Sequence, residues 1–332
     1  MKKAPMLLFL ALVSYGHLRA DPLPGPGDSL LPVRTNLVVS SDEHFVETEL
    51  EEIESGYLVT GDHRRTLNKL LKMFGSQQGG WNKRMRYRLY DDLAHVSARL
   101  RLYPLAMKCF YNASRQADGL PADSSLYRGD TVAESMPIAA DSIRLAFADG
   151  RDAVAYALLV EVKQPVPGKR KAFTHINNVG HTFITLIKYN RDSSVISRSF
   201  GFYPYKGGML DATPLHPNSP SVIKDDSRHE WDELAGKFIT ERQFHKIIEA
   251  LQTYEGKVYN LNHRNCTDFG LTMAGIGGIG IERSIGPWPL GRGNNPGSAG
   301  QSMLEGKVSN LDLVDTEPLF VAKVTSIFRN DP

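Results

Sequence analysis

Cysteine is scarce in this chain of 332 residues, since Cys109 and Cys266 are the only two. Two cysteines form at most one disulfide, so the fold cannot depend on a disulfide framework and has to bury an apolar core instead. A disulfide between Cys109 and Cys266 is the alternative to a free, reactive Cys266.

An excess of one charge is also missing: lysine and arginine number 39, aspartate and glutamate number 37, and the formal net charge is +2. This balance gives no basis for an extended surface that binds nucleic acid or an anionic membrane.

Long apolar runs are missing too. Residues 1–20 carry two lysines, a short apolar stretch over residues 6–13 and the small Ala20 before Asp21. The apolar stretch is shorter than the ~20 residues that span a bilayer. This pattern predicts a cleaved signal peptide over residues 1–20, and therefore an exported protein, periplasmic or secreted, without stable membrane insertion. The alternative is a retained anchor or a buried helix.

The first half of the chain has helical periodicity. Residues 21–35 are rich in proline and glycine and are interpreted as a linker. A helical region is expected over residues 36–118, opened by a capping box of Ser40 and Glu43. It ends in two antiparallel helices that turn at Tyr103-Pro104. This region could dock a protein partner or pack on the following domain.

The second half has mixed periodicity. A linker is expected over residues 119–137, a domain over 138–300 and a C-terminal extension over 301–332. The expected strands cover residues 153–162, 181–188 and 195–202, and the expected loop covers 204–230. One helix follows a capping box of Thr240 and Gln243, and a second runs from Cys266 to about residue 274. The strands and helices together indicate an α+β domain.

Cys266 is the residue whose surroundings indicate chemistry. It falls at the expected start of a helix, in the run Asn265-Cys-Thr-Asp-Phe269. The positive end of a helix dipole stabilises a thiolate, and free N–H groups in the first turn can hold an oxyanion. His181, which opens an expected strand, supplies a proton acceptor. Either residue alone is more often structural, but together they form the minimal pair for covalent acyl transfer.

The order and surroundings of this pair resemble a known family. Gly180-His181-Thr-Phe-Ile is followed by Phe200-Gly-Phe-Tyr-Pro204, a capped helix, and Tyr259-Asn-Leu before the Asn265-Cys-Thr-Asp-Phe269 run. This order is similar to that of the circularly permuted papain-like cysteine hydrolases, relatives of NlpC-type cell-wall endopeptidases and lecithin–retinol acyltransferase. The resemblance covers about residues 150–285.

The resemblance implies a fold and residue roles. The fold is α+β, a permuted papain-like domain with an antiparallel sheet packed on helices, preceded by the helical N-terminal region. Cys266 would be the nucleophile, His181 the general base, and the backbone N–H of Cys266 part of the oxyanion site. The third, orienting residue stays open. Tyr203 would lie opposite His181 if the hairpin closes at residues 191–193, and Asp268 lies one turn into the helix.

The expected function is therefore an exported cysteine hydrolase, a thiol peptidase or amidase that cleaves an amide bond through an acyl-cysteine. The resemblance and the compartment make a peptide substrate from peptidoglycan the first candidate. The alternatives are an acyltransferase or a lipid or ester hydrolase on the same fold, or a non-catalytic binding module that uses the helical hairpin.

Other motifs do not add a cofactor to these expectations. Residues 275–280 match GxGxxG, but they follow a helix rather than a strand, so a turn is expected there and not a dinucleotide site. His263 with Cys266 and a distant histidine is the alternative of a zinc site, without HExxH or paired-cysteine spacing to support it. We expect no cofactor and no metal.

Overall fold

A computed structural model describes residues 41–76, 81–121, 139–173, 179–205, 212–288, 290–312 and 319–323. The chain divides into two units, Met1–Val39 and Ser40–Pro332, and every described residue belongs to the second. The expected signal peptide, the linker at 21–35 and the capping residue Ser40 lie outside the described residues, as does most of the linker expected at 119–137.

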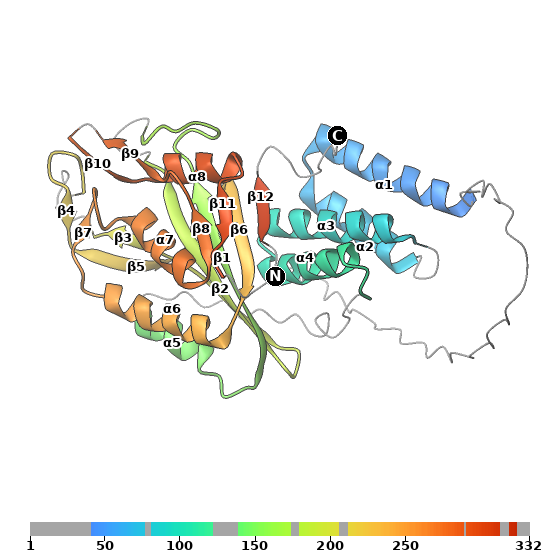
Figure 1. The fold of residues 1–332 in the computed structure, drawn as a ribbon, viewed down its shortest axis with the longest axis horizontal. Coiled ribbons are helices and arrows are strands. Elements are labelled where there is room, and N and C mark those ends of the chain that lie inside the picture. The colour runs from blue at the N-terminus through green and yellow to red at the C-terminus, as the bar shows by residue number, and fades with distance from the viewer. Residues whose placement is uncertain are drawn as a thin grey trace, which may run out of the picture. The chain divides into compact units, whose positions relative to one another are not determined.

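The centre of the second unit is a six-stranded sheet in the order β12-β6-β1-β2-β3-β5, in which every recorded pairing is antiparallel (Figure 1). Its strands are β1 (Ala153–Lys163), β2 (His181–Asn190), β3 (Val195–Pro204), β5 (Ser221–Asp225), β6 (Glu233–Ile239) and β12 (Phe320–Lys323). Residues of β1 and β2 are buried almost throughout, because helices cover both faces of the sheet. This explains why β1 is a nearly continuous apolar run in the sequence.

Three smaller sheets of two strands each surround the large one. They pair β4 (Asn218–Ser219) with β7 (Tyr259–Asn260), β8 (Ile279–Ile281) with β11 (Val308–Asn310), and β9 (Ile285–Trp288) with β10 (Gly291–Asn294).

One face of the sheet packs against the N-terminal helices. These are α1 (Ser41–Thr60), α2 (His63–Ser76), α3 (Lys83–Arg99) and α4 (Tyr103–Ala117). Side chains at alternate positions of β1, Ala157 and Leu159, share a buried apolar cluster with Leu93 of α3 and Met107 of α4. The helical N-terminal region is thus built into the core of this unit.

The other face packs against α5 (Ala140–Phe147), α6 (Glu241–Tyr254), α7 (Cys266–Ile276) and α8 (Pro296–Leu304). Figure 1 shows α6 and α7 lying over this face. Phe269 of α7 stacks on Phe202 of β3, with ring centroids 6.0 Å apart. A Cβ on Gly270 would lie 2.6 Å from the Thr182 side chain, so the glycine lets α7 approach β2 closely. The predicted α+β class with a helical N-terminal region is confirmed.

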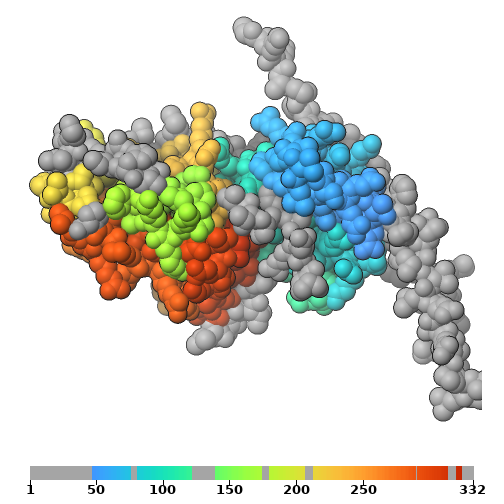
Figure 2. Space-filling view, turned by 90° about the horizontal axis from the view of Figure 1, so that it is seen from above, coloured from blue at the N-terminus to red at the C-terminus, as the bar shows by residue number. Residues whose placement is uncertain are grey.

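The segment after β1 packs against α8, as the space-filling view shows (Figure 2). The Gln164 amide donates to the Gly297 carbonyl at 3.0 Å, and Arg170 donates to the Ser298 carbonyl at 3.1 Å. These bonds hold the end of β1 against α8. The end of β1 lies beside β2, the strand that carries His181.

Several predicted boundaries are wrong for identifiable reasons. The helical hairpin turns at residues 100–102, and Pro104 lies in the first turn of α4, where a missing N–H costs nothing. The expected loop over 204–230 contains β4 and β5, which its prolines and glycines concealed. The expected extension over 301–332 supplies β12, an edge strand of the main sheet. Among the described residues, no helix is both long enough and apolar enough to cross a bilayer.

Candidate active site

Cys266 is the first residue of α7, and its position is fixed by the cap before it. The side chain of Asn265 accepts hydrogen bonds from the N–H groups of Thr267 and Asp268, at 2.7 and 3.0 Å. The Asp268 carboxylate accepts the Asn265 N–H at 2.9 Å, which completes a capping box. Asn294 also donates to Asp268, at 2.6 Å. Asp268 therefore serves the cap, and the structure does not bring it to His181.

Asn265 has a second task that an aspartate could not perform. Its amide nitrogen donates to the carbonyls of Leu261 and Asn294, at 2.8 and 2.7 Å. A carboxylate has no donor, so it would leave both buried carbonyls unpaired. These bonds hold the loop before α7 against the β9–β10 hairpin.

The thiol of Cys266 faces His181. Burial disfavours ionisation of the thiol, but hydrogen bonds from His181, the Thr182 N–H and the Thr267 hydroxyl, together with the charge on His181, lower its pKa. Both residues are buried, with 7% of Cys266 and 5% of His181 exposed. The structure thus brings together the two residues that the sequence paired across 85 positions.

The imidazole of His181 is also bound to Asp226. Its Nε2 lies 3.2 Å from Asp226 Oδ2, which leaves Nδ1 for the thiol. Burial lowers the pKa of His181, but the charge and hydrogen bond of Asp226 and the contact with Cys266 outweigh it and raise the pKa to about 9. A lowered thiol pKa and a raised imidazole pKa favour a thiolate–imidazolium pair at neutral pH.

Tyr203 lies beside His181 but does not bind it through its hydroxyl. The hairpin turns at residues 191–193, and the register of β2 and β3 brings the two rings to 4.2 Å between centroids. The Tyr203 hydroxyl instead donates to Asp226 Oδ1. The predicted orienting residues, Tyr203 and Asp268, are therefore not the group that binds the imidazole; Asp226 is.

Sequence reasoning missed Asp226 because it lies just past β5, in the segment interpreted as a loop. The Asp226 N–H donates to the Ser199 carbonyl at 2.9 Å, and the His229 N–H donates back to the Asp226 carbonyl at 2.8 Å. The turn is therefore pinned to β3 and also carries His229, whose ring centroid is 5.0 Å from that of His181. The available signal was the apolar pair Val222-Ile223 followed by two aspartates at a strand end.

Gly201 of β3 lies directly under the contact between His181 and Asp226. A Cβ at this position would lie 2.5 Å from His181 Nε2 and 2.4 Å from Asp226 Oδ2. No side chain can occupy that space while the two groups stay bonded. The glycine in the Phe200-Gly-Phe-Tyr-Pro204 motif thus has a direct geometric reason.

Tyr259 is a second residue to which the sequence assigned no role. Its phenol is buried and interacts with the thiol and the backbone N–H of Cys266. Burial and the nearby thiolate raise the pKa of Tyr259, so it remains a neutral donor. The Cys266 N–H donates to the Tyr259 oxygen, so the Tyr259 hydroxyl is the donor beside Cys266 that could hold an oxyanion.

The other expectations concerned metals, cofactors and disulfides. Cys109 and Cys266 form no disulfide, and Cys109 lies in α4 on the opposite face of the sheet. Among the described residues, no group of three or more His, Cys, Asp or Glu side chains could hold a metal ion, and His263 is exposed. Residues 275–280 form the end of α7, a turn and the start of β8, the reverse of the strand-to-helix order of a dinucleotide site.

Comparison of the chain with protein-family models, with curated proteins and with solved structures finds no significant match. The geometry of the site is therefore the basis for a functional assignment.

Proposed function

We propose that this protein is a cysteine hydrolase that cleaves an amide bond through an acyl-cysteine intermediate, on a papain-like domain of permuted connectivity. The observation that carries the proposal is the Cys266–His181–Asp226 chain, with the thiol at a helix N-terminus and the imidazole bound by a carboxylate at 3.2 Å. Nucleophile, base and orienting carboxylate are the three parts that define this class of site.

The first half-reaction forms the intermediate. The Cys266 thiolate attacks the carbonyl carbon, and a carbon–sulfur bond forms while the carbonyl electrons move to oxygen. When that oxyanion collapses, the carbon–nitrogen bond breaks, and the His181 imidazolium gives its proton to the leaving amine. Water then attacks the acyl-cysteine, His181 removes its proton, and the thiolate leaves.

Donors beside Cys266 would hold the oxyanion. The Tyr259 hydroxyl lies beside the thiol, and the backbone N–H of Cys266, at the positive end of α7, would be a second donor once it releases the Tyr259 oxygen. Asp226 keeps the imidazole in one orientation, and Tyr203 holds the second oxygen of that carboxylate. Tyr259 would thus act at the Cys266 end of the Cys266–His181–Asp226 chain, and Tyr203 at its Asp226 end.

The connectivity supports the papain-like assignment. The histidine strand β2 precedes the nucleophile helix α7 in the chain, which is the order of the permuted branch. The order of strands and helix, the packing of α7 on β2 and the Cys–His pair agree with that scaffold. A cysteine at the capped start of a helix, facing a histidine on a strand, is also what the sequence resemblance implies.

The first substrate candidate is the peptide of peptidoglycan, which follows from the expected export and from the resemblance. Transfer of the acyl group to an acceptor other than water, or hydrolysis of a lipid or ester, would use the same intermediate. A Cys266 side chain far from His181 would have favoured the alternative of a binding module; the contact between the two residues favours an enzyme.

The test is to trap the intermediate. Purified protein is incubated separately with peptidoglycan peptides, activated acyl esters and phospholipids, and the intact mass is followed with time. We expect an added acyl mass on Cys266 with the peptide substrate, its loss in Cys266→Ala and its persistence in Cys109→Ala. Acylation by lipid alone would favour the lipid hydrolase or transferase, and acylation that persists in Cys266→Ala would disprove the proposal.

A further inference from the structure

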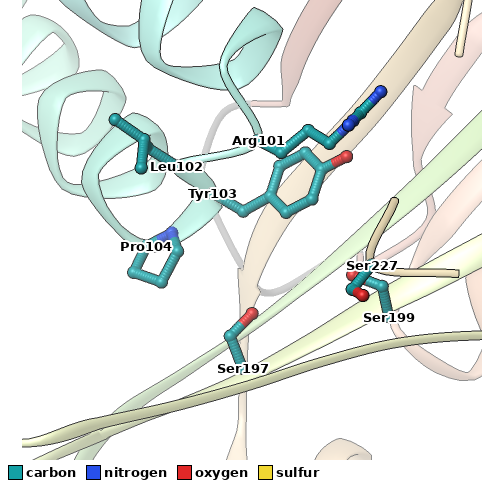
Figure 3. Close-up of a pocket in the computed structure, with 7 residues that line it drawn as sticks. All are labelled: Arg101, Leu102, Tyr103, Pro104, Ser197, Ser199 and Ser227. Atoms are coloured by element: carbon teal, nitrogen blue, oxygen red, sulfur yellow. The ribbon is translucent and has the colours of Figure 1, made fainter. Parts of the chain in front are cut away.

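A polar cavity of about 70 Å³ lies on the opposite side of the sheet from α7, between the start of α4 and β3 (Figure 3). Its polar lining comes from Arg101 and Tyr103 in the helical hairpin, Ser197 and Ser199 in β3, and Ser227 in the turn after β5. A water needs ~10–15 Å³ of such space, so the cavity has room for several waters or one small polyatomic ion.

Arg101 gives the cavity an unneutralised positive charge. No hydrogen bond or ion pair to its guanidinium is found among the described residues, although the group lies near the Tyr103 hydroxyl. Its backbone has φ of 61°, a left-handed conformation that few non-glycine residues adopt. This conformation closes the C-terminus of α3, since the Arg101 N–H donates to the Ala98 carbonyl and the Leu102 N–H to the Ser97 carbonyl.

Tyr103 supplies a buried hydroxyl. The residue is 3% exposed, and its hydroxyl forms no hydrogen bond of good geometry, although the Trp231 indole lies close enough to oppose the rise in its pKa. In Figure 3 the hydroxyl points toward the side of the cavity where Arg101 lies. A buried hydroxyl without a partner costs free energy unless a ligand or a water binds it.

The start of α4 adds further positive potential. Leu102 occupies the N-cap position and offers no side-chain acceptor to the N–H groups of the first turn. Uncapped N–H groups and the helix dipole both favour an anion at this end of a helix.

Two acidic groups lie near this cavity: Asp225 accepts a hydrogen bond from the lining residue Ser227, and Glu161 of β1 is linked to Ser199 through Thr185. The Thr185 hydroxyl lies 2.7 Å from Glu161 Oε1 and 2.7 Å from Ser199 Oγ. Burial raises the pKa of Glu161 to about 8, so the carboxyl is neutral at pH 7. The Thr185 hydroxyl donates to Glu161, so the Ser199 hydroxyl donates to Thr185 and does not supply a hydrogen to the cavity. Ser227 donates to Asp225 at 3.1 Å, so it shapes the cavity rather than donating into it.

We propose that this cavity binds a small oxyanion, either inorganic phosphate or sulfate or the carboxylate of a larger ligand, through Arg101 and the Tyr103 hydroxyl. The site is separate from Cys266 and does not depend on the proposed hydrolase activity. Its position beside the turn that carries Asp226 places the bound ion next to the residues that hold the candidate active site.

The test is isothermal titration calorimetry on the whole protein with sodium phosphate, sodium sulfate and sodium acetate, at constant ionic strength set with sodium chloride. Arg101→Asn removes the guanidinium but keeps a residue that tolerates the left-handed backbone. We expect one site per chain, weakened about tenfold or more by this change and about fivefold by Tyr103→Phe. Arg84→Gln, at an exposed position of α3, is the matched control and should not alter the affinity.

A preference for phosphate or sulfate would identify a free inorganic ion, and a preference for acetate would identify a carboxylate ligand. Binding that is absent for all three anions, or equal in Arg101→Asn and the unaltered protein, would overturn the proposal. Cys266→Ala should bind the anion as the unaltered protein does, so failure of the hydrolase proposal and failure of this one are distinguishable.

Discussion

The two cysteines occupy opposite layers of the same sheet, and their surroundings differ in almost every respect except burial. Cys109 lies inside α4 in the apolar cluster with Met107 and is 1% exposed. Cys266 opens α7, is 7% exposed and faces His181. Exposure alone would assign both the same chemistry. What distinguishes Cys266 from Cys109 is its position at a helix N-terminus and its contact with a base.

The largest effect is expected from Asp226→Asn. The amide has the same size, but it no longer charges the imidazole and can hold the wrong tautomer of His181. We predict that the labelling rate of Cys266 by a thiol-directed acyl electrophile falls roughly 100-fold or more while that of Cys109 is unchanged. Intact-mass time courses on both cysteines measure it. An unchanged Cys266 rate would mean that Asp226 plays no part in activating the thiol.

Gly201→Ala should give the next largest effect. The added methyl group would occupy the space between His181 Nε2 and Asp226 Oδ2, and the ends of these two side chains can move apart without disturbing β3. We predict about a tenfold fall in the Cys266 labelling rate with unchanged circular dichroism. The matched control is Gly275→Ala in α7, where a Cβ meets nothing within 4 Å. If both glycine variants label at the normal rate, the His181–Asp226 contact is not needed.

The pH dependence of turnover should reflect the two shifted groups. Activity rises with pH as the thiol, whose pKa is lowered, ionises, and it falls as His181 loses its proton near its pKa of about 9. Asp226 raises the pKa of His181, so Asp226→Asn should move the alkaline limb to lower pH. Initial rates over pH 5–10 check this. An alkaline limb that stays in place in the variant would contradict the assigned cause.

The smallest effect on rate is expected from Asp268→Ala. Asp268 belongs to the cap of α7, so its loss should lower the free energy of unfolding by about 1 kcal/mol. The labelling rate should change less than about threefold, because the carboxylate does not bind His181. Urea denaturation and the mass assay together separate the two outcomes. A large fall in rate at unchanged stability would return Asp268 to the role that the sequence left open for it.

Local sequence patterns predict much of the six-stranded sheet and the helices α6 and α7 that pack on it. β1, β2 and β3 are rich in apolar and β-branched residues and are bounded by turn residues, and α6 follows the predicted capping box of Thr240 and Gln243. Cys266 and His181 could be named because each lies at an element boundary that the sequence signals. These features depend on neighbours a few residues away.

The remaining parts of the site depend on contacts between distant segments. Asp226 is 45 residues from His181, and its position depends on the pairing of β5 with β3. The prolines and glycines around β5 predict a loop, so the sequence does not indicate this pairing. The role of Tyr259 likewise depends on how the loop before α7 folds back on Cys266. Periodicity and capping rules carry no information on such pairings.

The most direct measurement is the intact mass and peptide map of the protein after brief exposure to a limiting amount of a thiol-directed acyl electrophile. Both thiols are buried, so accessibility does not decide the outcome in advance. We predict a single added group on Cys266, abolished in His181→Gln, with Cys109 unmodified. Equal modification of both cysteines, or modification of Cys266 that does not depend on His181, would contradict an activated nucleophile at the start of α7.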